Sequence, residues 1–137
     1  MRIILLSAAL AMALFATACS GGTLGTDDTS SILRIETSAG VLIASGDNRG
    51  SVTMDVGDQR TFRIIRVVTN DHSPTETTDV TADADFNFGN TSVASMDLNG
   101  VLTALASGFT TLEVIYRDGD GDPTDDDTVN LDITVMP

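Results

Sequence analysis

The chain has 137 residues, 20 acidic side chains against 7 arginines, no lysine, and a formal net charge of −13. A surface this acidic excludes nucleic acid as a partner, because contacts to phosphate require cations. The single cysteine and the single histidine cannot form an internal disulfide or close a zinc site.

The N-terminal segment is typical of a secretory signal. Arg2 supplies a short positive segment, an apolar run extends from Ile3 to Phe15, and small residues lead to Cys19. The run is shorter than the about 20 apolar residues of a membrane span, and a signal peptide with a small-residue cleavage site has this pattern. Cys19 directly after Ala16-Thr17-Ala18 resembles the bacterial lipoprotein box, although Ala16 stands where Leu is commoner. The resemblance implies that residues 1–18 are removed and that Cys19 is lipidated and anchors the protein to a membrane. An ordinary secretory peptide that removes Cys19 is the alternative.

Residues 19–31 are predicted to be the lipidated cysteine and a flexible tether. The segment from Ser20 to Ser31 is rich in Gly, Ser, Thr and Asp, so it has almost nothing to bury. Loss of Arg2 with the signal leaves 6 arginines against 20 acids, a charge of −14. An Asp after the lipidated cysteine would resemble the inner-membrane retention signal of Gram-negative lipoproteins. Ser20 at that position favours the outer membrane of the cell envelope, if the organism has one.

Residues 32–137 have the size of one domain and show no helical periodicity. Short strands recur with Gly, Asn and Asp between them, which predicts an all-β sandwich. The strands expected in the first half are Ile32–Thr37, Val41–Ile43, Ser51–Val56 and Arg60–Thr69. The segment Asn70–Thr78 is polar and contains Pro74, so we expect a loop there.

The second half alternates between apolar and polar residues more regularly. The expected strands are Asp85–Phe88, Val93–Met96, Val101–Ala104, Thr111–Tyr116 and Val129–Val135, the last two forming a hairpin. The Asn99-Gly100 pair predicts a tight turn, because both residues tolerate positive φ. The predicted core contains Ile35, Phe62, Ile64, Phe86, Val93, Leu102, Leu112, Val114, Leu131 and Ile133.

The stretch from Phe86 to Leu112 resembles the bacterial immunoglobulin-like domain, group 2. That family reads approximately as an aromatic residue, S-x-N, and then V-A-x-V-D-x-x-G-x-V-T-A-L-x-x-G-x-A-x-I. Phe86 stands for the usual Trp, Thr91 where Pro is common, and Thr110 where Ala is usual. The matching residues are Phe86, Asn90, Val93, Ala94, Met96, Asp97, Gly100, Leu102, Thr103, Ala104, Leu105, Gly108, Thr110 and Leu112. The resemblance implies an immunoglobulin-like Greek-key sandwich in which these residues are structural and none is catalytic.

The sequence DGDGDPTDDD before the last strand carries candidate metal ligands. Carboxylates at alternate positions wrap Ca²⁺ in many loops, and the candidate ligands here are Asp118, Asp120, Asp122, Asp125 and Asp126. An EF-hand is not expected, because Val129 stands where its bidentate acid belongs. The other interpretation is an exposed acidic turn that discourages edge-to-edge association. Weak Ca²⁺ binding is the one cofactor that the sequence suggests.

The sequence contains no recognisable pairing of nucleophile and base and no phosphate-binding loop, so we expect no enzyme activity. His72 lies beside Pro74 in a polar stretch and is expected to be solvent-exposed. The first hypothesis is a surface- or periplasm-facing lipoprotein whose domain binds a protein or glycan at the cell surface, as the resemblance to adhesin domains implies. The alternatives are a structural envelope or spacer component and a Ca²⁺-responsive domain. Fold alone does not separate these hypotheses.

Overall fold

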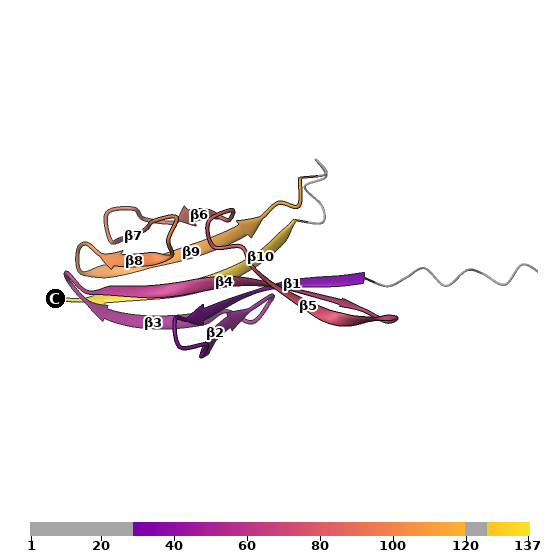
Figure 1. Ribbon diagram of the computed structural model, residues 1–137. Coiled ribbons are helices and arrows are strands. Elements are labelled where there is room, and N and C mark those ends of the chain that lie inside the picture. Colours follow the sequence, from indigo (N-terminus) through magenta and orange to yellow (C-terminus); the bar gives the residue numbers. More distant parts are fainter. Residues whose placement is uncertain (1–28, 120–125) are drawn as a thin grey trace, which may run out of the picture.

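The computed structural model describes residues 29–119 and 126–137, and these residues form two layers of β-strands (Figure 1). The strands are β1 (Thr29–Thr37), β2 (Leu42–Ser45), β3 (Gly50–Asp55), β4 (Gln59–Asn70), β5 (Ser73–Asp79), β6 (Asp85–Phe88), β7 (Ala94–Met96), β8 (Val101–Ala104), β9 (Gly108–Tyr116) and β10 (Asp127–Met136). The described residues contain no helix. The all-β sandwich predicted from the sequence is therefore the observed fold class.

The strand order identifies the kind of sandwich. One sheet has the order β2-β1-β4-β8-β7, with β5 also paired to β4, and the other has the order β3-β10-β9-β6. The orders β1-β4-β8-β7 and β10-β9-β6 are those of strands A-B-E-D and G-F-C in an immunoglobulin sandwich. Strand β3 joins β10 in parallel, and β9 pairs with β10 as the expected antiparallel hairpin. The topology is thus immunoglobulin-like, with β2 and β5 as additions.

The core lies between the two sheets and follows the alternation of each strand. In β10, Val129, Leu131, Ile133 and Val135 are buried, and the residues between them are at least partly exposed. Every predicted core residue is buried except Phe86, which is only partly buried and packs against the core cluster. The sequence analysis missed several buried residues on the first strands, namely Leu33, Ala44, Val52 and Met54.

Strand β4 buries side chains on both of its faces, as its sequence predicted. Phe62 and Ile64 belong to the core between the sheets. Ile65 and Val67 are also buried, and because neighbouring residues of a strand point to opposite faces they lie on the outer side of the sheet. The long strand β4 is therefore the centre of its sheet, pairing with β1, β5 and β8.

Two predictions are wrong at one end of the molecule. Thr29–Ser31 were assigned to the tether, but they open β1 and pair with Val68–Asn70 of β4. The loop expected at Asn70–Thr78 is largely strand β5, which forms a hairpin with β4 that extends, beside the start of β1, past the other strands (Figure 1). All residues of β5 are exposed, so no alternation marked it in the sequence. Its place at a sheet edge tolerates Pro74, which cannot donate a ladder hydrogen bond.

Candidate functional site

Asp97 and Gly100 form the tight turn between β7 and β8. The Oδ1 atom of Asp97 accepts hydrogen bonds from the backbone N–H groups of Asn99 and Val101, each at 2.9 Å. The bond from Val101, together with those from Asn99, holds the pKa of Asp97 below its ordinary value. Gly100 has a φ of 78°, and its carbonyl accepts the N–H of Phe62 at 2.9 Å. This turn therefore ties β8 to β4.

Asn90 forms a second turn in the same stretch. Its Oδ1 accepts the N–H of Ser92 at 3.0 Å, and its own N–H donates to the Thr110 hydroxyl at 2.9 Å. Thr110 is buried, and this hydrogen bond gives its hydroxyl a partner. Among the other motif residues, Val93, Ala94, Leu102, Ala104 and Leu112 are buried, Phe86, Met96 and Thr103 are partly buried, and Leu105 and Gly108 are exposed. The stretch thus contributes turns and packing rather than a cleft.

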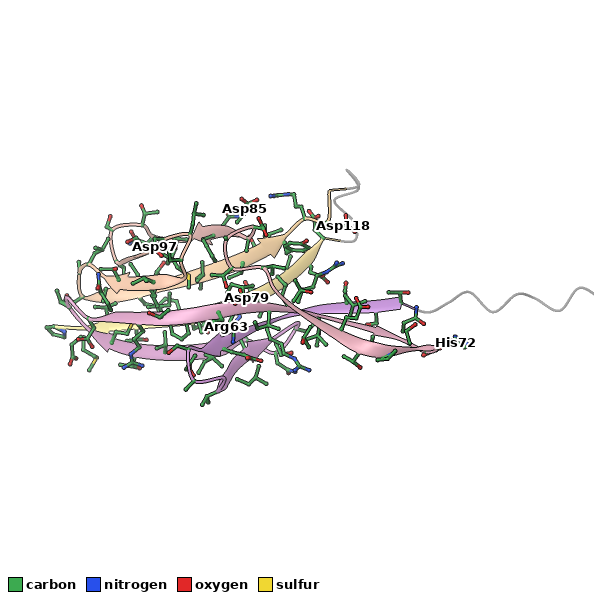
Figure 2. All side chains as sticks on the ribbon, viewed as in Figure 1. Arg63, His72, Asp79, Asp85, Asp97 and Asp118 are labelled. Atoms are coloured by element: carbon green, nitrogen blue, oxygen red, sulfur yellow. The ribbon has the colours of Figure 1, made fainter. Side chains whose placement is uncertain are left out.

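The candidate metal loop is described only at its two ends. Asp120, Asp122 and Asp125 lie outside the described residues, whereas Asp118 and Asp126 lie within them. Arg117 pairs with Asp85, and its Nε lies 3.5 Å from Oδ2 of Asp126. Figure 2 shows Asp118 toward the end of the upper layer, next to the grey trace, and Asp85 nearer the middle of that layer. Within residues 29–119 and 126–137, no three His, Cys, Asp or Glu residues are grouped so that they could hold a metal ion.

A second arginine holds the strand that follows this loop. The Nε of Arg66 donates to Oδ2 of Asp127 at 2.8 Å, and the Ser31 hydroxyl donates to Oδ1 at 2.7 Å. The Arg66 guanidinium also lies over the ring of Tyr116, 5.2 Å from its centroid. Asp127 is only 8 % exposed, and these two donors compensate its buried charge. The result is a polar closure at the loop end of the sandwich.

A third polar cluster joins β4 to the residues after β5. Thr81 donates its hydroxyl and its backbone N–H to Asp79, and the same hydroxyl accepts the N–H of Ile64 at 2.9 Å. Desolvation by itself raises the pKa of Asp79, but hydrogen bonds from Thr81 and Arg63 outweigh it and hold that pKa below the ordinary value. Figure 2 shows Arg63 and Asp79 in the middle of the sandwich and His72 at the tip of the β4–β5 hairpin. His72 is exposed, as expected.

The sequence analysis missed a groove where β1, β2, β3 and β4 meet. Its volume is about 370 Å³, and it is lined by Thr37, Ser38, Ile43, Ser51, Val52, Thr53, Arg60, Thr61 and Phe62. Strands β1 and β2 belong to one sheet and β3 to the other, so the chain crosses between the sheets after β2, and the groove lies at this crossing. A side chain on Gly50 would overlap the Ile43 carbonyl. Strands β2 and β3 therefore touch at Gly50, and the groove opens beside Ser51–Thr53.

The groove has an apolar floor and a polar rim. Val52 and Phe62 are buried and Ile43 is partly buried, whereas most of the hydroxyl-bearing residues of the lining are exposed. Arg60 lies opposite the buried Leu102 in the β4–β8 pair, and directly opposed residues share a face. Arg60 therefore projects from the core face of β4. The sequence signal at this position is a charged residue on the strand parity of Phe62 and Ile64, which Arg60 shares with Arg66 at the other end of β4.

Arg60 differs from most other arginines of the domain. Arg49, Arg63, Arg66 and Arg117 each form an ion pair with a carboxylate. Within the part of the chain that the structure describes, Arg60 forms neither an ion pair nor a side-chain hydrogen bond. The groove lining contains no carboxylate. The groove is therefore a cationic site in a strongly acidic chain.

Cys19 lies outside the described residues. Among those that are described, no helix is long and apolar enough to cross a membrane. Compared with family models and with curated proteins, the chain matches none of them. The resemblance to the group 2 bacterial immunoglobulin-like domain therefore depends on the motif residues of the sequence.

Proposed function

We propose that the protein is a lipid-anchored, non-catalytic binding module of the bacterial cell envelope. The observation that carries this proposal is the open, cationic groove between β1–β2 and β3. The immunoglobulin-like topology supports it, because such sandwiches present ligand sites on a rigid frame. The signal and the cysteine at position 19 supply the proposed anchor.

The chemistry of the groove favours binding over catalysis. Its lining offers hydroxyls, one guanidinium and an apolar floor, but no His, Cys, Asp or Glu. A hydroxyl becomes a nucleophile only beside a base, and none lines this groove. Pockets that combine an apolar surface with a few polar groups are typical of ligand recognition.

The proposed tether keeps the domain near the membrane. The nine residues between Cys19 and Thr29 span at most about 30 Å when fully extended. The mature charge of −14 repels anionic lipid headgroups, so the domain is held close to the bilayer without binding it. This arrangement suits a short-range binding or adhesion module, on the outer membrane in a Gram-negative cell, that captures a protein or glycan at the periplasmic or outer surface.

The anchor is tested by replacing the cysteine. We expect Cys19→Ser to move the protein from the membrane fraction to the soluble fraction. Mass spectrometry should find acyl chains on the mature N-terminus of the parent and none on the variant. A variant that still fractionates with membranes would contradict the lipid anchor.

The binding function is tested against the alternative of a structural spacer. Fluorescently labelled full-length chain is added to cells from which its gene has been deleted, with unlabelled chain as competitor. A binding module should label the cells saturably and be displaced by the competitor. A spacer or envelope component, whether or not Ca²⁺ stiffens it, should label them weakly and without saturation.

A further inference from the structure

We propose that the groove binds a short, extended peptide that pairs with the free edge of β3 and places a carboxylate on Arg60. This inference rests on the proposed binding function and names the class of ligand. It combines three observations about the groove: an unpaired backbone edge, an apolar floor and an arginine without a carboxylate partner.

The first observation is the edge of β3. Strand β3 ends its sheet and has one hydrogen-bonded neighbour, β10. Apart from that pairing, Ser51, Val52 and Thr53 make no backbone hydrogen bond within the described residues. These three residues line the groove. An exposed strand edge of this kind is a template for an added strand, as in domains that bind peptides by β-augmentation.

The second observation is the shape of the groove. Val52 and Phe62, both buried, form the floor, and Ile43 stands at one side. A volume of about 370 Å³ lies at the lower end of the roughly 300–1,000 Å³ of small-ligand pockets. Strand β2 comes so close to Gly50 that a Cβ there would overlap the Ile43 carbonyl, so the groove lies beside the next residues of β3, Ser51–Thr53. The space therefore suits a few residues of an extended chain with one apolar side chain inserted.

The third observation is the charge. Arg60 projects from the core face at the start of β4, beside five hydroxyl-bearing residues and no acid. An arginine binds a carboxylate through two parallel N–H···O bonds, and such charged bonds are stronger than neutral ones. Because most of the other arginines that the structure describes already have carboxylate partners, Arg60 is the cation that remains available in the groove. The rest of the strongly acidic chain repels anions, so a ligand carboxylate is favoured only where it reaches Arg60.

The experiment maps binding on the ¹⁵N-labelled full-length chain in mild detergent. The probe is the peptide acetyl-Val-Thr-Val-Glu with a free C-terminus, and its neutral counterpart is acetyl-Val-Thr-Val-Gln amide. We expect saturable NMR shifts at the amides of Ser51, Val52 and Thr53 and at Nε of Arg60. The charged peptide should bind about tenfold tighter, since bonds to charged groups contribute about 1.4 kcal/mol or more. A version with N-methylated Thr, which loses a backbone donor, should bind more weakly.

Variants identify the residue that recognises the carboxylate. In Arg60→Gln the charged peptide should bind no more tightly than the neutral one. Arg117→Gln makes the same change in net charge at the acidic loop and should preserve the tenfold difference. The competing possibility is that the Arg60 stem covers apolar surface while its guanidinium remains in water. In that case Arg60→Gln will leave the ratio of the two peptide affinities unchanged, which would contradict the proposal.

Several results would overturn the proposal. One is the absence of saturable shifts at Ser51–Thr53 with peptide up to about 10 mM, a range that includes weak, millimolar binding. Equal affinity of the N-methylated peptide would exclude strand pairing. Sodium acetate or glucuronate that shifted the same amides as strongly would indicate a simple anion or an acidic sugar instead. If cells are labelled saturably and Arg60→Gln labels them equally, the groove assignment fails while the proposed binding function stands.

Discussion

Two regions of the domain are held together by contacts that span different distances along the chain. One region is residues 85–116, which form β6 to β9, and the other is residues 29–70, which form β1 to β4. In the first region, side chains close turns locally: Asp97 accepts N–H groups two and four residues ahead, and Asn90 accepts one two residues ahead. In the second region, β1 and β3 belong to different sheets, and the bare backbone of Gly50 lets β2 and β3 meet. Local turns pack their strands tightly, whereas the crossing between sheets leaves a groove. We therefore expect the turns of the first region to be sensitive to small changes and the groove side of the second region, at β2 and β3, to tolerate them better.

The largest contrast should come from truncating one apolar side chain in each region. Leu112 is fully buried, and Leu112→Ala should lower the free energy of unfolding by about 3–4 kcal/mol, because it leaves a cavity. Ile43 is partly buried at the groove, so Ile43→Ala should cost only about 1 kcal/mol. Urea unfolding followed by circular dichroism measures both losses. Equal losses would show that the crossing region is packed as tightly as the turn region.

The next contrast concerns two glycines that approach a carbonyl oxygen. A Cβ at Gly100 would overlap the Phe62 carbonyl of the central strand β4, and its φ of 78° is unfavourable for alanine. Gly100→Ala should therefore cost about 2–4 kcal/mol. Gly50→Ala would overlap the Ile43 carbonyl of the edge strand β2 but adds no positive-φ strain, so we expect a smaller cost of about 1–2 kcal/mol.

Gly57→Ala is the matched control for Gly100→Ala. Gly57 has a φ of 90°, but a Cβ there would meet nothing within 4 Å, so the variant reports backbone strain alone, about 1–2 kcal/mol. The comparison uses the urea midpoints of the three variants. If Gly100→Ala is no worse than Gly57→Ala, the contact of Gly100 with β4 does not stabilise the fold.

The same contrast explains which features the sequence could predict. The turn at Asp97–Gly100 and the alternation of β10 are local patterns, so their strands were predicted within a few residues. Strand β5 was missed because an edge strand that buries nothing has no alternation to detect. Phe86 was placed too deep because the same aromatic spacing fits a strand at the edge of the core.

The groove could not be predicted in the same way. Its lining comes from four strands in two sheets, and a strand pattern gives the face of a residue but not the spacing between sheets. Two charges, Arg60 and Arg66, share the parity of the core residues Phe62 and Ile64, and Arg60 is the one that lines the groove. Burial and pairing in three dimensions were needed to show that Ser51–Thr53 have a free edge.

A smaller effect is expected from Ca²⁺ at the acidic loop that joins β9 to β10. The hypothesis comes from the alternate aspartates, of which Asp120, Asp122 and Asp125 lie outside the described residues. A weak site with a Kd of about 1 mM would stabilise the fold by about 1.4 kcal/mol at about 10 mM Ca²⁺, which raises the Tm by several degrees. Melting curves in CaCl₂ are compared with MgCl₂ and NaCl at equal ionic strength, because any salt screens repulsion. Equal shifts in all three salts, or unchanged shifts in Asp120→Asn and Asp122→Asn, would leave only a solvated acidic turn.

The smallest expected effect is the pH dependence of the turn at Asp97, the most local of these interactions. The N–H groups of Val101 and Asn99 bind the ionised carboxylate and lower its pKa in the folded state. The carboxylate therefore stabilises the fold fully above its unfolded pKa of about 3.9, and this contribution disappears as the pH falls through the lower folded value. Asp97→Asn keeps an oxygen acceptor but loses the charge, so it should be less stable than the parent at pH 6 and approach it below about pH 3.9. Urea midpoints across this range measure the difference, with Asp47→Asn, an exposed residue with the same change in net charge, as control. If the two variants have the same profile, the effect comes from overall charge, and the Asp97 hydrogen bonds do not make the turn region pH-sensitive.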